Sequence, residues 1–213
     1  MNTWERLWRT AGIQFVGLTI LAYLIYGDLP GMAAPADAVG SFYHGDRMRV
    51  LIASIFSGLA VLNLMWFAAA LRATLADAGY DSWGAAATAS SAAVGALAFV
   101  LIAIAATLAY SNADVLNDFA WTCGVVSSFP RAMLIMSSAF GLWRAKLISN
   151  ALFTAGVAVV ILGVLGGTTW AHEGLWAPDG TYSRFILPVL SLVWVLVVSR
   201  VLLTRAPATR AGW

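Results

Sequence analysis

The chain has 213 residues, of which 61 % are hydrophobic and 10 % are charged, and its mean hydropathy is +0.83. Soluble domains average about 25 % charged residues, so this composition excludes an ordinary soluble fold and favours a helical membrane protein. The net charge of +2 is small, and no Lys/Arg run is dense enough to attract a polyanion. We therefore expect an all-α, multi-pass membrane protein with no nucleic-acid partner.

Six apolar segments are candidates for membrane-spanning helices, since a hydrocarbon core of about 30 Å takes roughly 20 residues at ~1.5 Å each. In chain order we predict spans at about 11–26, 50–71, 85–110, 119–143, 147–165 and 185–203. Together they form one domain, 1–213. The basic start, the first apolar run and the small residues 33–38 also fit a cleavable signal peptide, but we interpret this run as a permanent span.

Two longer polar connections hold both histidines of the chain. The connection 27–46 contains His44 and Asp46, and the connection 166–183 contains His172 and Glu173. Imidazole and carboxylate groups are ordinary Zn²⁺ ligands, so a metal site would form if the two connections met. The spacing matches no known metal motif, and solvated loop residues explain the same sequence. We therefore expect no metal.

We also expect no cofactor. Histidines that lie in loops cannot hold a haem between helices, and the sequence has no Gly-rich phosphate loop or catalytic nucleophile motif. The one cysteine, Cys123, excludes an intramolecular disulfide and a Cys-based metal site. We interpret it as a buried structural thiol.

The fourth predicted span contains a proline followed by an arginine. Pro130 has no N–H, so the Val126 carbonyl loses its helical donor, and the helix is expected to kink there. Arg131 then lies near the middle of the bilayer. A permanently charged guanidinium costs from about 2.5 to more than 10 kcal/mol at that depth, so it should face the protein interior and have partners.

An intramembrane charge marks a functional site by default. No Asp or Glu lies deep in any predicted span, so Arg131 needs either carbonyl groups and Asn63 of the second span, or the anionic head of a lipophilic molecule. The first alternative makes Arg131 purely structural. The second predicts a ligand-binding site, with no catalytic residue, formed by Arg131, Asn63, Ser127, Ser128, Trp121 and Phe129.

The basic residues predict the orientation of the spans. With both termini in the cytoplasm, eight basic residues face the cytoplasm and three face outward, as the positive-inside rule favours. The inner set is Arg6, Arg9, Arg72, Arg144, Lys146, Arg200, Arg205 and Arg210, and the outer set is Arg47, Arg49 and Arg184. Asp114 and Asp118 fall at the outer end of the fourth span.

Three sequence stretches carry a resemblance to a known family. They are SFYHGDRMRV before the second span, SSFPRAMLI in the fourth, and PVLSLVWVLVVSRVLL in the sixth. With the six-span layout, they resemble a family of small bacterial membrane proteins, of the actinobacterial type, that is catalogued only as a domain of unknown function. The resemblance implies the topology and a location in the bacterial inner membrane. It brings no ligand or catalytic residue with it.

Three functions are open at this point. The first is a non-enzymatic bundle that binds or passes an anionic lipophilic small molecule near Arg131. The second is an accessory subunit or homo-oligomer whose small-residue helix faces pack against other membrane helices. The third is an enzyme acting on an isoprenoid or lipid, with Asp118 as its acid and tryptophan faces that stabilise cations. Membrane lipids are partners in all three.

Overall fold

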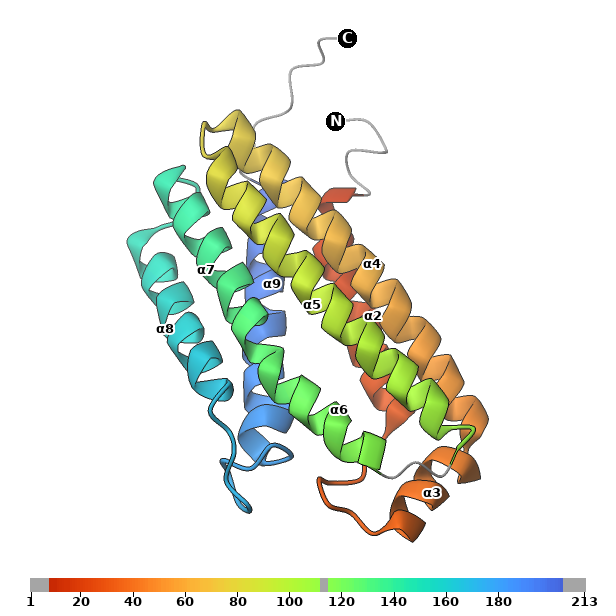
Figure 1. Cartoon of the computed structure of the whole chain (residues 1–213). Coiled ribbons are helices and arrows are strands. Elements are labelled where there is room, and N and C mark those ends of the chain that lie inside the picture. The colour runs from red at the N-terminus through yellow and green to blue at the C-terminus, as the bar shows by residue number, and fades with distance from the viewer. Residues whose placement is uncertain (1–7, 112–114, 205–213) are drawn as a thin grey trace.

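The computed structural model describes residues 8–111 and 115–204, and all regular elements in those ranges are helical. The long helices lie side by side and run alternately up and down (Figure 1). In chain order the elements are α2 (Ala11–Tyr26), α3 (Ala36–Gly45), α4 (Arg47–Asp77), α5 (Asp81–Leu108), α6 (Val115–Val126), α7 (Ser128–Arg144), α8 (Asn150–Gly166), the π-helix η1 (Tyr182–Ile186) and α9 (Leu187–Thr204).

Four helical segments of the described chain are long and apolar enough to cross a membrane, which supports a membrane protein. They are Arg47–Asp77, Asp81–Leu108, Val115–Arg144 and Tyr182–Thr204. The first and fifth predicted spans coincide with two shorter apolar helices, α2 and α8.

The two ends of the bundle differ in what they contain. We call the end that holds α3 the α3 end and the opposite one the far end (Figure 1).

Helix α3 corrects a sequence expectation, because residues 36–45 were expected to be part of a loop. Pro35 precedes the helix and Asp37 lies in its first turn, both of which favour a helix start. Val39 and Tyr43 are four residues apart and therefore share one face. Both are buried against Ile104 and neighbouring residues of α5. Tertiary burial of this small apolar face is what makes the segment helical.

Small residues bring α4 and α5 together. A side chain at Gly84 would meet the Cα of Arg72 at 2.8 Å, so the two backbones approach closely at this point. Further along, the Ser91 hydroxyl donates to the Leu64 carbonyl at 3.3 Å, and Gly95 faces Val61. The predicted small-residue face of the third span is therefore a packing surface for the second.

Helix α8 packs in the same way through Gly156 and Gly163. An added Cβ at Gly156 would meet the Trp194 ring at 2.5 Å, and one at Gly163 would meet Ala132 at 3.0 Å. The indole of Trp194 donates to Ser138 at 2.9 Å and so joins α9 to α7. Glycine is required at these positions because a larger residue would push the neighbouring helices apart.

The buried apolar residues form two clusters, one in each half of the bundle. The larger cluster fills the far half with residues such as Phe67, Leu71, Leu142 and Leu202. The smaller cluster lies at the α3 end and joins Tyr43 of α3 to Ile104, Leu108 and their neighbours. The space between the two clusters is therefore where an internal cavity can form.

The helix that spans 115–144 is interrupted at one residue. Helix α6 ends at Val126, α7 begins at Ser128, and Ser127 lies between them. The Ser127 N–H donates to the Cys123 carbonyl at 2.9 Å, and the Arg131 N–H donates to the Ser127 carbonyl at 3.2 Å. Pro130 cannot donate to Val126, which explains why the regular pattern stops at this point.

The close approach of α4 and α5 gives a stability prediction. We expect Gly84→Ala to lower the free energy of unfolding by roughly 1–3 kcal/mol, because the Arg72 backbone cannot move away from the new methyl group. Gly58→Ala is the matched control, since nothing lies within 4 Å of its added Cβ. The control should gain about 0.5–1 kcal/mol from helix propensity. Reversible unfolding in mixed micelles measures both, and equal effects would contradict the packing account.

Candidate ligand-binding site

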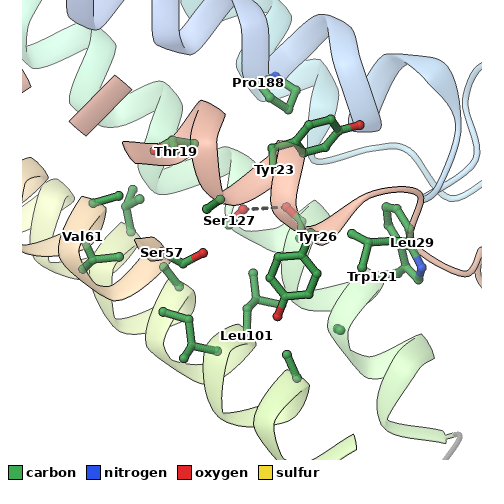
Figure 2. Close-up of a pocket in the computed structure, with 18 of the residues that line it drawn as sticks. Thr19, Tyr23, Tyr26, Leu29, Ser57, Val61, Leu101, Trp121, Ser127 and Pro188 are labelled. Carbon is green, nitrogen blue, oxygen red and sulfur yellow. Dashed lines mark hydrogen bonds between the residues drawn. The ribbon is translucent and has the colours of Figure 1, made fainter. Parts of the chain in front are cut away.

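A cavity of about 440 Å³ lies inside the bundle. Its volume falls within the ~300–1,000 Å³ of typical small-molecule sites, and its walls are mostly apolar. Figure 2 shows side chains from several helices around it, including Thr19, Tyr26, Ser57 and Val61. The helix residues that line it are Phe15, Thr19, Ala22, Tyr23, Tyr26, Tyr43, Ser57, Ala60, Val61, Leu64, Val94, Ala98, Leu101, Ile102, Ala105, Asn117, Ala120, Trp121, Gly124, Arg131, Ser183 and Pro188.

The cavity occupies only the half of the bundle nearer the α3 end. Leu64, Val94 and Arg131 are lining residues near the middle of their long helices, whereas Tyr43 and Asn117 lie at the α3 end. Beyond the middle, the larger buried cluster fills the bundle. The cavity therefore has one deep end, beside Arg131, and one end toward the α3 side.

Arg131 is held by the interrupted turn of its own helix. Its Nε donates to the Ser127 carbonyl at 3.2 Å, and its Nη2 donates to the Gly124 carbonyl at 3.0 Å and to the Ser127 hydroxyl at 2.6 Å. The Ser127 hydroxyl itself donates to Gly124 at 2.6 Å. The guanidinium consequently lies beside Gly124 and Ser127, two residues that also line the cavity.

These bonds leave part of the guanidinium available. An arginine has five N–H donors, and three of those of Arg131 are used within its own helix. Within residues 8–111 and 115–204, no hydrogen bond involves Nη1 and no carboxylate forms an ion pair with Arg131. Its positive charge is therefore neutralised by no acidic side chain in the described chain, and it adjoins an open volume.

Three of the six residues predicted for the site line this cavity. Arg131 and Ser127 form its deep end, and Trp121 stands near the α3 end, where Figure 2 also shows Leu29. The indole N–H of Trp121 donates to the Pro30 carbonyl at 2.9 Å, so its ring is fixed with one edge on the chain that follows α2. The cavity lining therefore includes the predicted cation, one of the two predicted serines and one of the two predicted aromatic residues.

The other three predicted residues point elsewhere. The Asn63 amide donates to the Leu59 carbonyl of its own helix at 2.9 Å. Ser128 is 2 % exposed and contacts the backbone at Gly166, and the Phe129 ring packs on Gly167. Two residues along a helix correspond to a rotation of about 200°, so Phe129 faces away from Arg131. The structure does not bring these three side chains to the cavity.

Tyr26, Tyr43 and Asn117 line the cavity and were not singled out from the sequence. Asn117 is 2 % exposed and occurs within an apolar helix, the same signal that drew attention to Asn63. The two tyrosines gave no comparable signal, because Tyr26 ends a helix and Tyr43 belonged to an expected loop. Their positions depend on α3, which packs across the α3 end of the cavity.

Residues 28–33, which we call the strap, close one side of this end. Side chains of α6 hold three of them: Trp121 donates to the Pro30 carbonyl, Asn117 donates to the Gly31 carbonyl at 2.8 Å, and the Ala33 N–H donates to Asp118 at 2.7 Å. Leu29 of the strap lines the cavity. The strap is therefore a fixed wall of the cavity.

The segment before α9 holds the other three strap residues. Arg184 forms an ion pair with Asp28 and donates to the Leu29 carbonyl at 3.1 Å. Asp179 accepts the Met32 N–H at 3.0 Å. Arg184 lies in the wide turn of η1, where the Leu187 N–H donates to Tyr182, five residues back. Every strap residue thus has a side-chain or backbone bond to a distant segment.

The histidines and acids of the connections do not assemble into a metal site in the part of the chain that the structure describes, where no group of three or more His, Cys, Asp or Glu is suitably placed. His44 lies in α3 with Nε2 3.2 Å from the Ser111 carbonyl, and Asp46 pairs with Arg49 at 3.4 Å. Asp114 is outside the described residues, as are Arg6, Arg205 and Arg210.

The bonds to the strap give a prediction for local dynamics. We expect Asn117→Leu to speed amide exchange at Met32 and Ala33 by roughly fivefold, since the Gly31 carbonyl loses its donor and one hydrogen bond contributes about 1 kcal/mol. Asn150→Leu is the control, because Asn150 bonds only to groups at the far end. Hydrogen exchange read by mass spectrometry measures both. Unchanged exchange in Asn117→Leu would mean that α6 does not hold the strap.

Comparison with known proteins leaves the family unassigned. No family model, no curated protein and no solved structure matches the chain. The resemblance to small bacterial membrane proteins therefore remains an expectation from the sequence.

Proposed function

We propose that this protein binds an anionic lipophilic small molecule in the cavity, with the anion on Arg131 and the apolar part against the surrounding walls. The observation that carries the proposal is the guanidinium that adjoins an open, mostly apolar volume and has no carboxylate partner in the described chain. A carboxylate or phosphate monoester can accept charge-assisted bonds from the Nη1 group.

Electrostatics favour an anion over a neutral ligand. A charge away from water in a low-dielectric interior is costly unless it is paired. Carbonyl dipoles of Gly124 and Ser127 offset part of that cost for Arg131 but leave the net charge in place. An anion that enters the cavity cancels this charge, whereas a neutral chain of the same length only adds apolar contact.

The shape of the cavity favours binding over passage. Its lining residues stop near the middle of the helices, and buried residues such as Phe67 and Leu71 fill the space beyond. A pathway through the protein would need that cluster to open. Asp118, the acid required by the enzymatic alternative, accepts a bond from the strap at Ala33 and is not a lining residue. This contact also supports a binding role.

For the membrane topology we propose six spans, with both termini in the cytoplasm and the fourth span kinked at Pro130. Each of α2 and α8 runs antiparallel to its neighbours along the bundle (Figure 1). In this arrangement the α3 end and the strap face outward, and Arg72, Arg144 and Lys146 face the cytoplasm. The ligand then enters from the outer leaflet of the membrane, which we propose to be a bacterial inner membrane.

The binding proposal predicts a loss of charge selectivity in Arg131→Gln. In phosphatidylcholine nanodiscs at pH 8, the parent protein should bind decanoate more tightly than decanol. The substitution should weaken decanoate binding by roughly 30-fold or more, the effect of removing one partner of a desolvated charge pair, and leave decanol binding almost unchanged.

Arg200→Gln is the matched control for this experiment, because Arg200 is an exposed arginine of α9 that does not line the cavity. It should bind decanoate like the parent protein. A thermal unfolding curve for each variant separates lost binding from lost folding. Equal decanoate affinity in folded Arg131→Gln and in the parent would overturn the proposal.

The topology proposal predicts opposite labelling of two introduced cysteines. In a Cys123→Ala background, Asp77→Cys lies at the last residue of α4 and Glu173→Cys lies in the connection after α8. A membrane-impermeant maleimide added to intact cells should label the second site and not the first. If α8 does not cross the membrane, both cysteines lie on the same side and the labelling patterns will agree.

A further inference from the structure

The hydroxyl groups that line the cavity differ in whether their protons are already donated. Thr19 donates to the Phe15 carbonyl, Ser57 to Ala53, and Ser127 to Gly124, each within its own helix, while Ser183 donates to the Thr169 hydroxyl. These groups contribute polarity to the wall but have no proton left for a ligand.

The Tyr26 hydroxyl is used in a similar way. It lies 3.2 Å from the Ser54 hydroxyl, and Ser54 donates its own proton to the Val50 carbonyl at 2.8 Å. Ser54 must therefore be the acceptor and Tyr26 the donor. The Tyr23 hydroxyl makes no hydrogen bond with the described residues, but Tyr23 is 41 % exposed at the protein surface.

Tyr43 is the exception among the buried lining residues. It is 4 % exposed, and its hydroxyl has no hydrogen-bond partner within residues 8–111 and 115–204. Burial, with a smaller contribution from nearby Tyr26, raises the pKa of Tyr43 above the ordinary tyrosine value, so the phenol keeps its proton. The hydroxyl oxygen is not among the fully buried, unpartnered polar atoms of the described residues, so it is accessible at the cavity that the ring lines. The cavity therefore has an unused donor at its α3 end.

The unused donor and the cation lie at different ends of the cavity. Tyr43 packs in the cluster that includes Leu116 and Ala120, near the start of α6. The Arg131 guanidinium lies beside Gly124 and Ser127, about seven residues further along this helix. At ~1.5 Å per residue, this corresponds to a rise of roughly 10 Å along α6 between the cluster that holds Tyr43 and the guanidinium. Apolar residues such as Ala98 and Leu101 line the wall between them.

We propose that Tyr43 is a specificity-determining residue, and that the ligand is a single-chain amphiphile with an anionic group at one end and a second oxygen roughly 10 Å away. The anion binds Arg131, and the second oxygen accepts the Tyr43 hydroxyl proton. This inference rests on the proposed function and adds the second polar group to it. A hydroxyl or carbonyl at that position is preferred over a methyl group, because only an oxygen can accept the Tyr43 hydroxyl proton.

The experiment compares two probes that differ by one oxygen. Decanoate has an anion and an apolar tail, and 10-hydroxydecanoate adds a hydroxyl at the end of the same chain. The parent protein in nanodiscs should bind 10-hydroxydecanoate more tightly than decanoate, because the bond to Tyr43 offsets the cost of removing the probe's hydroxyl from water. Tyr43→Phe keeps the ring and removes the donor, so it should weaken 10-hydroxydecanoate binding by about fivefold, the equivalent of one hydrogen bond, and leave decanoate unchanged.

Tyr110→Phe is the matched control, since it removes the hydroxyl of a tyrosine that is 60 % exposed and does not line the cavity. It should affect neither probe. Equal loss of both probes in Tyr43→Phe, or loss of neither, overturns the role of Tyr43 while decanoate binding still supports the site at Arg131. If the parent protein binds neither probe, the proposed function itself fails. A thermal unfolding curve shows whether Tyr43→Phe is folded.

Discussion

The site depends on how one guanidinium is accommodated away from water. Arg131 donates backward into the interrupted turn at Gly124 and Ser127, which exists because Pro130 has no N–H to donate to Val126. The proline and the arginine therefore act together: one disturbs the helix and the other uses the carbonyls beside it. Because these carbonyls are dipoles, they hold the cation without neutralising it.

The two buried clusters explain why a cavity adjoins this charge. Leucines and phenylalanines fill the far half, while α3 packs Tyr43 against α5 at the other end. Between the clusters, small residues such as Ala98 and Ala60 line the space. Close helix packing at Gly84 fixes the spacing of α4 and α5, and packing at Gly163 fixes the spacing of α7 and α8.

Much of the helical layout follows from hydropathy, and the four long apolar segments lie where the sequence predicts them. Arg131, Ser127 and Trp121 were also predictable, since a charge in an apolar helix needs partners near it. The rest depends on rotation and on tertiary packing. Asn63 was matched to Arg131 by depth alone, and depth does not fix the face of a helix that a residue occupies. Helix α3 is stabilised by burial of Val39 and Tyr43 against α5, which a local pattern does not reveal.

The strap has a consequence for how the protein is made. Asp28 and Arg184 are separated by 156 positions, so the ribosome synthesises Asp28 well before Arg184. Helix α2 is therefore synthesised long before the residues that fasten the strap behind it. The cavity wall beside Leu29 and Trp121 thus remains incomplete until η1 is synthesised. A nascent chain that stops before η1 has the guanidinium but lacks Arg184, which fastens the strap, and the lining residues Ser183 and Pro188.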